Sequence, residues 1–283
     1  MVLRMRCQRP FLTAVMMALL CAPAAAQGWR GQRLTIPLDP ATHGPALPKV
    51  RGPAGRPLVV IDAGHGGHDP GAQAAGDGMP EKTLTLAVAK KLRDALLATG
   101  RVRVALTREA DHFLVLRERT AIARNLKAQL FISIHADSAG SLASGASIYT
   151  LSEIASDQEA EALAARENKA DILNGVNLAR ADAAVTPILV DLAQRETTAA
   201  SRAFAELVRR EARGAVPFRT EGLRMAGLAV LKAPDMPAIL LELGYLSNPE
   251  DAARIRSDAG QAAIIGAIRR AVDIHFARRM IAP

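Results

Sequence analysis

The stretch Leu58-Val59-Val60-Ile61-Asp62-Ala63-Gly64-His65-Gly66-Gly67 joins a short aliphatic run to a glycine-rich turn. Four consecutive branched apolar residues bounded by turn residues predict a strand that is buried on both faces. Glycines after such a strand let the backbone crowd around a bound group, and they place His65 just beyond the strand end. Taken alone, the pattern is more typical of a plain tight turn with a surface histidine.

Aliphatic runs and helical patterns alternate after this stretch. Predicted strands lie at Leu58–Asp62, Val102–Leu106, Leu130–His135, Ala146–Thr150, Ala226–Leu231 and Ala238–Glu242. Predicted helices lie at Glu81–Thr99, Leu116–Asn125, Asp157–Asn168, Pro187–Arg213, Pro249–Ile255 and Asp258–Arg279. This order predicts an α/β fold with a mostly parallel or mixed sheet of about six strands and helices on both faces. Ligands in such folds collect where the strands end.

A second histidine and a glutamate lie at the ends of later predicted elements, and together with His65 they favour a metal site over a plain turn. His135 ends the predicted strand Leu130–His135, and Glu81 opens the helix Glu81–Thr99. A glutamate in the first turn of a helix is usually no more than a favourable partner for the helix dipole. Two imidazoles and one carboxylate are, however, the ligand set of a catalytic zinc, which lowers the pKa of bound water from 15.7 to roughly 7.

Glu242 is the candidate acid/base. It ends the apolar strand Ala238–Glu242, where a carboxylate is unfavourable unless it has a partner; a helix cap or an ordinary salt bridge is the alternative. Asp62 and Asp137 are better interpreted as residues that orient ligands or shape loops, although either could replace Glu81 as a ligand. His68 is expected at the rim of the site.

The N-terminus has the pattern of a secretory signal peptide, with three arginines, an apolar run and small residues before a cleavage site near Ala26. Residues 1–26 are therefore the predicted signal peptide, 27–56 a linker or N-terminal arm, and 57–279 one catalytic domain. Leu20 before Cys21 argues against a lipid anchor, so we expect no stable membrane anchor. Cleavage would remove Cys7 and Cys21, so a metal must be held by His, Asp or Glu.

Composition excludes few classes of function. The formal charge is +8, from 36 basic and 28 acidic residues, and loss of the three signal-peptide arginines leaves about +5. A modest basic excess suits an anionic polymer, but aromatic residues are only 3% of the chain, and no aromatic-rich basic stretch indicates nucleic-acid binding. The remaining histidines are candidates for metal ligation: His65, His68, His112, His135 and His275, with His43 in the predicted linker.

From Pro57 to Arg279 the chain resembles the zinc-dependent N-acetylmuramoyl-L-alanine amidases of the cell-division type. The resemblance rests on the opening stretch, on Glu81-Lys82, on Ser133-Ile134-His135-Ala136-Asp137, and on Leu241-Glu242-Leu243-Gly244-Tyr245-Leu246-Ser247-Asn248. It implies one zinc per chain, held by His65, Glu81 and His135, with Glu242 as the catalytic glutamate. The implied reaction is hydrolysis of the amide bond between N-acetylmuramic acid and L-alanine in peptidoglycan, by a periplasmic monomer that serves daughter-cell separation or wall remodelling.

Residues 151–202 exceed what a connection between two strands needs, and they contain a strongly polar helical pattern. A solvated surface helix is the simple interpretation. The resemblance implies instead an autoinhibitory helical insert that donates a glutamate to the zinc until a partner displaces it. We assign that role to Glu167, with Glu159 as the second choice, and expect a LytM-type activator protein as the partner. About 30 residues separate the signal peptide from the domain, too few for the family's wall-targeting module, so septal or diffuse action stays open.

Three other functions share parts of this pattern. Another secreted zinc peptidase would usually show His-Glu-x-x-His or His-x-x-Glu, but His68 is the third residue after His65. A zinc deacetylase would need an Asp-Asp or His-x-x-x-His arrangement, which we do not find. A non-catalytic wall-binding protein should have lost a ligand or Glu242, and all four positions are occupied.

Overall fold

The computed structural model describes residues 47–281 apart from 75, 139–142, 173–186 and 234. The predicted signal peptide, residues 27–46 of the predicted arm, and residues 173–186 of the predicted insert lie outside the described residues. The last part of the arm pairs with the domain, because Arg51 and Val104 exchange backbone hydrogen bonds of 2.9 Å in each direction. No helix in the part of the chain that is described is long and apolar enough to cross a membrane.

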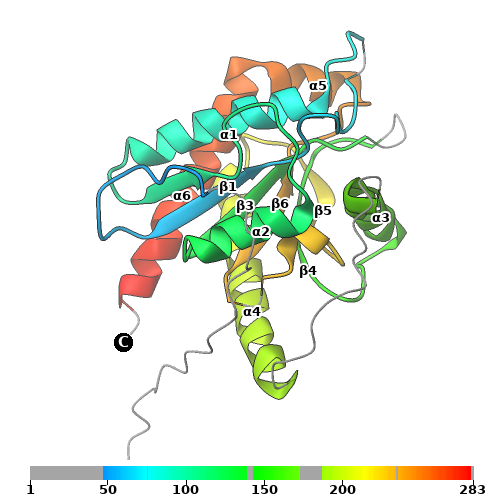
Figure 1. The fold of residues 1–283 in the computed structure, drawn as a ribbon. Helices are drawn as coiled ribbons and strands as arrows, with labels where there is room; N and C mark the ends of the chain where they lie inside the picture. Colours follow the sequence, from blue (N-terminus) through cyan, green and yellow to red (C-terminus); the bar gives the residue numbers. More distant parts are fainter. Residues whose placement is uncertain (1–46, 75, 139–142, 173–186, 234, 282–283) are drawn as a thin grey trace, which may run out of the picture. The chain divides into compact units, whose positions relative to one another are not determined.

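A mixed sheet in the order β2-β1-β3-β6-β4-β5 forms the centre of the fold (Figure 1). Its strands are β1 (Leu58–Ala63), β2 (Arg103–Leu106), β3 (Leu130–His135), β4 (Ala146–Leu151), β5 (Phe218–Ala226) and β6 (Ala238–Glu242). All neighbouring pairs are parallel except β4 and β6, which are antiparallel. The carboxyl ends of β1, β3 and β6 therefore meet the amino ends of β4 and β5 at one edge, which we call the catalytic edge.

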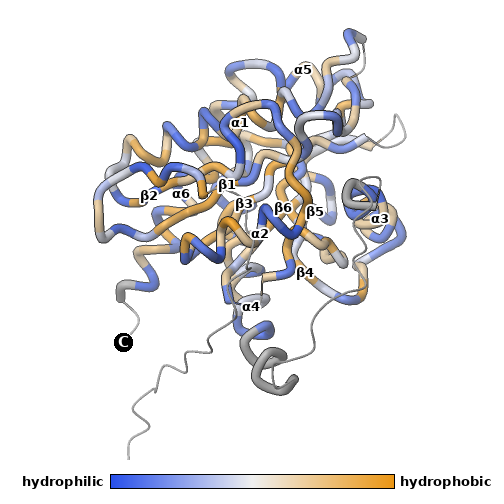
Figure 2. Tube along the Cα trace, in the orientation of Figure 1, coloured by the Kyte–Doolittle hydropathy of each residue, from blue (hydrophilic) through white to orange (hydrophobic). Residues whose placement is uncertain are grey.

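Helices cover both faces of the sheet, as the sequence predicted. The helices are α1 (Glu81–Leu97), α2 (Leu116–Asn125), α3 (Gln158–Ile172), α4 (Pro187–Ala212), α5 (Pro249–Arg256) and α6 (Asp258–Ile281), with a 3₁₀ turn, η1 (Ala229–Leu231). Side chains of α1, α4 and α6 pack in one hydrophobic cluster with the sheet, and side chains of α3 and η1 pack in another on the opposite face. Figure 2 shows the corresponding apolar colouring along the strands.

The strand predicted at Ala226–Leu231 was wrong. β5 ends at Ala226, and the apolar residues after it form η1 instead. β5 is one of the two outer strands of the sheet, and most of its side chains are exposed or only partly buried. Its sequence Phe-Arg-Thr-Glu-Gly-Leu-Arg-Met-Ala accordingly mixes polar and apolar residues. Its two arginines face α3, as described below. An apolar run was therefore the wrong signal for this strand.

Candidate metal centre and catalytic carboxylate

The loop after β1 holds His65 in a conformation that side chains rarely adopt, with φ 60°. Two buried arginines fix it through backbone carbonyls. Arg119 donates to the oxygens of Ala63 and His65 at 2.8 and 2.9 Å, and Arg108 donates to those of Ala63 and Gly64 at 2.9 Å each. Several buried hydrogen bonds from charged groups hold the backbone of this loop in its unusual conformation, and they therefore fix the position of the His65 imidazole.

Asp62, near the end of β1, stabilises the same loop. Its carboxylate is fully buried and accepts hydrogen bonds from Thr107, Ser133 and Arg119 at 2.6, 2.7 and 3.0 Å. Burial alone would raise the pKa of Asp62, but Arg119 and the two hydroxyls outweigh it and hold that pKa below its ordinary value. Because these partners engage both oxygens, Asp62 shapes the loop rather than replacing Glu81.

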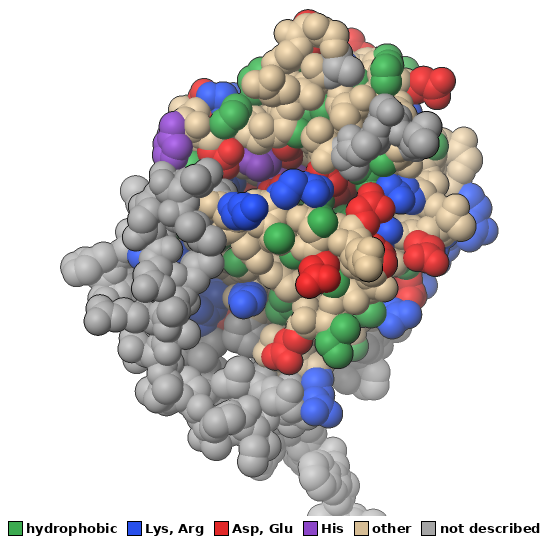
Figure 3. All heavy atoms as spheres, turned by 90° about the vertical axis from the view of Figure 1, so that its right-hand side faces the viewer, with side chains coloured by type: hydrophobic (Ala, Val, Ile, Leu, Met, Phe, Trp, Pro, Cys, Tyr) green, Lys and Arg blue, Asp and Glu red, His purple; other side chains and the backbone are tan. Residues whose placement is uncertain are grey.

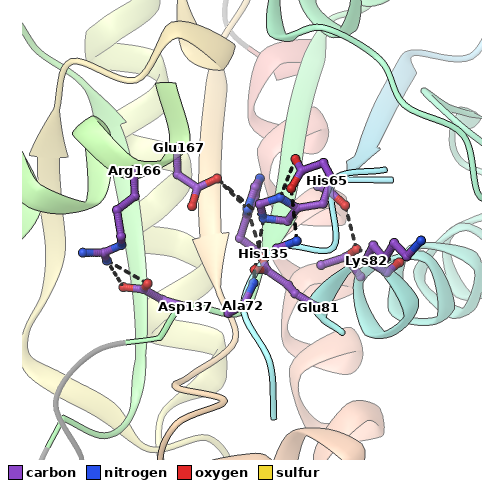
Figure 4. Close-up of polar contacts among 12 residues, drawn as sticks. His65, Ala72, Glu81, Lys82, His135, Asp137, Arg166 and Glu167 are labelled. Carbon is purple, nitrogen blue, oxygen red and sulfur yellow. Dashed lines mark hydrogen bonds and ion pairs between the residues drawn. The ribbon is translucent and has the colours of Figure 1, made fainter. Parts of the chain in front are cut away.

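Glu81 lies between the two predicted histidine ligands (Figure 4). Its Oε2 is 3.0 Å from Nε2 of His65, and its Oε1 is 3.1 Å from Nδ1 of His135. The backbone N–H groups of Ala72 and Ala136 donate to the same two oxygens at 2.9 and 2.8 Å, which fixes the carboxylate. The structure thus brings together the three side chains that the sequence singled out as metal ligands.

Glu167 of α3 approaches the same point from the opposite side (Figure 4). Its Oε2 lies 3.2 Å from Nδ1 of His135 and 3.6 Å from Nε2 of His65. One ligand atom each of His65, His135 and Glu167 all lie within 4.8 Å of one another, a spacing that a metal ion could bridge. Glu159, the second choice for this position, lies elsewhere, against β5.

The two facing nitrogens have the character of metal ligands. Nε2 of His65 and Nδ1 of His135 are buried, and among the described residues neither forms a hydrogen bond, although carboxylate oxygens lie about 3 Å away. Asp69 contacts Nδ1 of His65 at 2.9 Å, the carboxylate–histidine pairing that orients ligands of metals. Burial lowers the pKa of His65, but Glu81, Asp69 and Glu167 outweigh burial and raise it well above its ordinary value. The site therefore favours a positive charge at this point, and its donor set fits a bound cation.

Glu242 completes the catalytic edge. It pairs in register with His135 and is only 2% exposed, and neither of its oxygens forms a hydrogen bond within the described residues. Burial, followed by the carboxylates of Asp137, Glu81 and Glu167, raises the pKa of Glu242 well above its ordinary value. A carboxyl group poised in this way beside a metal site can both accept and return a proton.

Asp137 pairs with α3 rather than with the two histidines. Both of its carboxylate oxygens accept hydrogen bonds from one guanidinium nitrogen of Arg166, at 2.7 and 2.8 Å, and this ion pair joins α3 to the loop after β3 (Figure 4). Burial raises the pKa of Asp137 to about 6 even though Arg166 acts in the opposite direction. The pair adds a second attachment of α3 beside Glu167.

The other histidines among the described residues are His68, His112 and His275. His68 is exposed and stacks on Phe113 with ring centroids 4.4 Å apart, and His112 is exposed as well. His275 is buried in α6 between two phenylalanines, and burial followed by Arg279 lowers its pKa to about 4. Neither His112 nor His275 contributes to the candidate site.

Little open space remains around the cluster. A cavity of about 260 Å³ is lined by residues that include His65, Glu81, Asp137 and, from α3, Arg166 and Glu167. Sites for drug-sized ligands usually span about 300–1,000 Å³. α3 thus supplies part of the wall of this cavity.

Comparison with known proteins shows the family of the chain. The family model Amidase_3, described as N-acetylmuramoyl-L-alanine amidase, matches residues 59–273. The chain is 34% identical to N-acetylmuramoyl-L-alanine amidase AmiA of Escherichia coli K12 over 237 residues, which are 83% of this chain and 81% of that one. It is 35% identical to AmiC of Escherichia coli O6:H1 over 85% of this chain but only 57% of the relative.

A solved structure has the same architecture. N-acetylmuramoyl-L-alanine amidase AmiC2 of Nostoc punctiforme superposes with a TM-score of 0.59 and 29% identity, over 80% of this chain and 100% of that one.

Proposed function

The chain belongs to the Amidase_3 family of N-acetylmuramoyl-L-alanine amidases, and from this premise we propose that it works through one zinc ion held by His65, Glu81 and His135. As a member of this family it hydrolyses the amide bond between N-acetylmuramic acid and L-alanine in peptidoglycan. The observation that supports the proposal is that two buried imidazole nitrogens without hydrogen-bond partners among the described residues, Nε2 of His65 and Nδ1 of His135, each lie about 3 Å from an oxygen of Glu81.

Zinc suits these donors. Two histidines and a glutamate are a ligand set of catalytic zinc, and such sites keep a further position open. When bound, zinc polarises a carbonyl oxygen and lowers the pKa of water. Asp69 holds Nδ1 of His65, which leaves Nε2 for the metal, and two backbone N–H groups hold Glu81 in place.

Glu242 has the position of the acid/base in this proposal. Its neighbour in the sheet is His135, so its carboxylate lies beside the metal ligands rather than among them. Its raised pKa, caused first by burial, lets it take a proton from the attacking water and pass that proton to the departing L-alanine nitrogen. A positioned group of this kind contributes roughly a hundredfold to ten-thousandfold in rate.

Regulation by α3 is the second part of the proposal. Glu167 occupies the space beside the histidine nitrogens that a substrate carbonyl would need, and the residues on either side of it, Arg166 and Asn168, attach the same turn of the helix to the domain. To drive such a helix from 99% closed to 99% open, a partner must prefer the open state by about 5.5 kcal/mol. A sizeable protein interface can supply this, so we propose a LytM-type activator that displaces α3.

The proposed setting is the periplasm. The N-terminal signal-peptide pattern, with cleavage near Ala26, supports export of a monomer that acts on peptidoglycan during daughter-cell separation or wall remodelling. N-terminal sequencing of protein recovered from the periplasm should begin at Gln27. A chain that still carries Met1 would contradict cleavage.

Digestion of purified peptidoglycan tests the proposed function. Mass spectrometry should detect free stem peptides that begin with L-alanine, and EDTA should abolish their release. Glu167→Ala should release more than the wild-type chain does in the absence of an activator. Products that carry a cut within the stem peptide, or a deacetylated sugar, would assign the site to another zinc hydrolase.

A further inference from the structure

Three donors from the body of the domain converge on one carboxylate of α3. Glu159 accepts two parallel hydrogen bonds from Arg219, at 2.8 and 2.9 Å, and a third from the hydroxyl of Tyr245 at 2.7 Å. Arg224 adds a longer contact of 3.4 Å. Bidentate pairing of an arginine with a carboxylate is the strong and geometrically selective form of the ion pair. We call Arg219, Arg224 and Tyr245 the arginine–tyrosine cluster.

The arginine–tyrosine cluster lies at the catalytic edge. β4 and β5 run antiparallel to β6, so the beginning of β5, with Arg219, comes to the edge where β6 ends in Glu242. Tyr245 follows Glu242 by three residues. On the face in Figure 3, Lys and Arg side chains lie beside acidic ones.

The carboxylate partners of the cluster all belong to the segment that must move. Arg224 is only 6% exposed and pairs with Asp157 at 3.1 Å and with Glu159, and Arg219 pairs with Glu159. Tyr245 is 2% exposed. Displacement of α3 would therefore leave two partly desolvated cations without an anion, an arrangement that is unfavourable until another carboxylate arrives.

We propose that the arginine–tyrosine cluster is a carboxylate-binding subsite for the stem peptide of the substrate, and that Glu159 occupies it while α3 is closed. The inference rests on the proposed function, because it takes the scissile amide to lie at Glu81, His65 and His135. Glu159 and Glu167 are eight residues apart on one helix, so their backbones are separated by roughly 12 Å.

That separation matches the stem peptide. An extended chain covers about 3.3–3.6 Å per α-linked residue, and a γ-linked glutamyl residue covers more because Cβ and Cγ join its main chain, so about 12 Å reaches the second or third residue beyond the scissile bond. Stem peptides carry carboxylates on the second and third residues. The helix α3 thus presents one carboxylate at the metal centre and another where the substrate would place its own.

Steady-state kinetics with a matched pair of substrates tests the subsite. The substrates are N-acetylmuramoyl-L-alanyl-D-γ-glutamyl-meso-diaminopimelate and its analogue with the carboxylates converted to amides. In the Glu167→Ala chain, amidation should raise KM about tenfold to a hundredfold, the value of a charge-assisted pair. Adding Arg219→Gln should raise KM for the free acid to that of the amide, and leave both kcat values and the KM of the amide unchanged.

Two further variants separate a subsite from a simple attachment of the helix. Arg213→Gln removes an exposed cation close by in sequence and should not alter the ratio of the two KM values. In the chain that keeps Glu167, where α3 is closed, Glu159→Gln leaves the arginines intact and should lower KM for the free acid more than for the amide, because it removes the competing carboxylate. Equal KM values for the two substrates before Arg219 is changed, with both hydrolysed, would overturn the subsite and leave the amidase standing. Hydrolysis of neither substrate would overturn both.

Discussion

Asn168→Ala should release α3 without touching a metal ligand. The side chain of Asn168 donates to the carbonyl oxygen of Gly227 at 2.9 Å and accepts from the N–H of Ala229 at 2.8 Å. Each neutral hydrogen bond contributes about 1 kcal/mol net, so the loss of both should favour the open helix by about 2 kcal/mol. Since every 1.4 kcal/mol is a factor of ten, the basal rate should rise about thirtyfold. The better helix propensity of alanine acts on the open and closed helix alike.

Dye release from labelled peptidoglycan, measured without an activator, provides the assay. Glu161→Gln is the matched control, because Glu161 is exposed on the same helix and should leave the basal rate unchanged. In a Glu167→Ala background, Asn168→Ala should add much less than thirtyfold, since the helix is already released. An unchanged basal rate for Asn168→Ala, or an equal rise for the Glu161 control, would refute the idea that these contacts hold α3 closed.

Four other substitutions test the site and its support. Glu242→Gln should retain the metal yet lower turnover by about a hundredfold to ten-thousandfold, as measured by metal analysis beside the peptidoglycan assay. His65→Ala should reduce the bound metal itself, and full occupancy by equilibrium dialysis would remove it from the ligand set. Gly64→Ala would place a methyl group 2.5 Å from the ring of His135, so metal affinity should fall while far-ultraviolet circular dichroism stays native. The pKa of Asp62 is lowered in the folded chain, so the ionised carboxylate stabilises the fold above the ordinary carboxyl pKa of about 3.9, and this stabilisation is lost as pH falls through the folded pKa. Asp62→Asn should lower the free energy of unfolding at pH 7 by about 3–5 kcal/mol, as measured by urea unfolding. It should also make the stability of the chain less sensitive to acid.

The sheet was predictable where burial is complete. β1 and β3 are buried at every position, so continuous aliphatic runs predicted them from the sequence. β6 is also buried throughout, and its only charged residue is Glu242 at its end. β5 was missed because an outer strand that contacts a polar helix has no apolar pattern. The alternation of strands and helices sufficed for the fold class.

The candidate metal ligands were predictable because each lies at or just beyond the end of a regular element. His135 ends a strand and Glu81 begins a helix, so the topology alone brings them to one edge. The supporting residues gave no comparable signal. Arg119 looks like an ordinary helix residue in sequence, yet it is buried and holds the His65 loop 54 residues away. Asp69 lies four residues after His65 in a loop of turn-forming residues, and only this closeness in sequence could have suggested that it contacts the His65 ring.

The attachments of α3 depend on contacts that span the chain. Glu159 meets Arg219 across 60 residues, and Asn168 meets Gly227 across 59. Local periodicity cannot reveal such pairs, because the helix would have the same pattern if it were fully solvated. Only the fold shows that its charged face is turned toward the catalytic edge.

X-ray diffraction on either side of the zinc absorption edge, from crystals of the protein purified with zinc, tests the central claim most directly. An anomalous difference map should contain one peak per chain, within bonding distance of His65, Glu81 and His135 and beside Glu242. A peak ligated by other residues, or no peak among these three side chains in protein that contains one zinc per chain, would contradict the account.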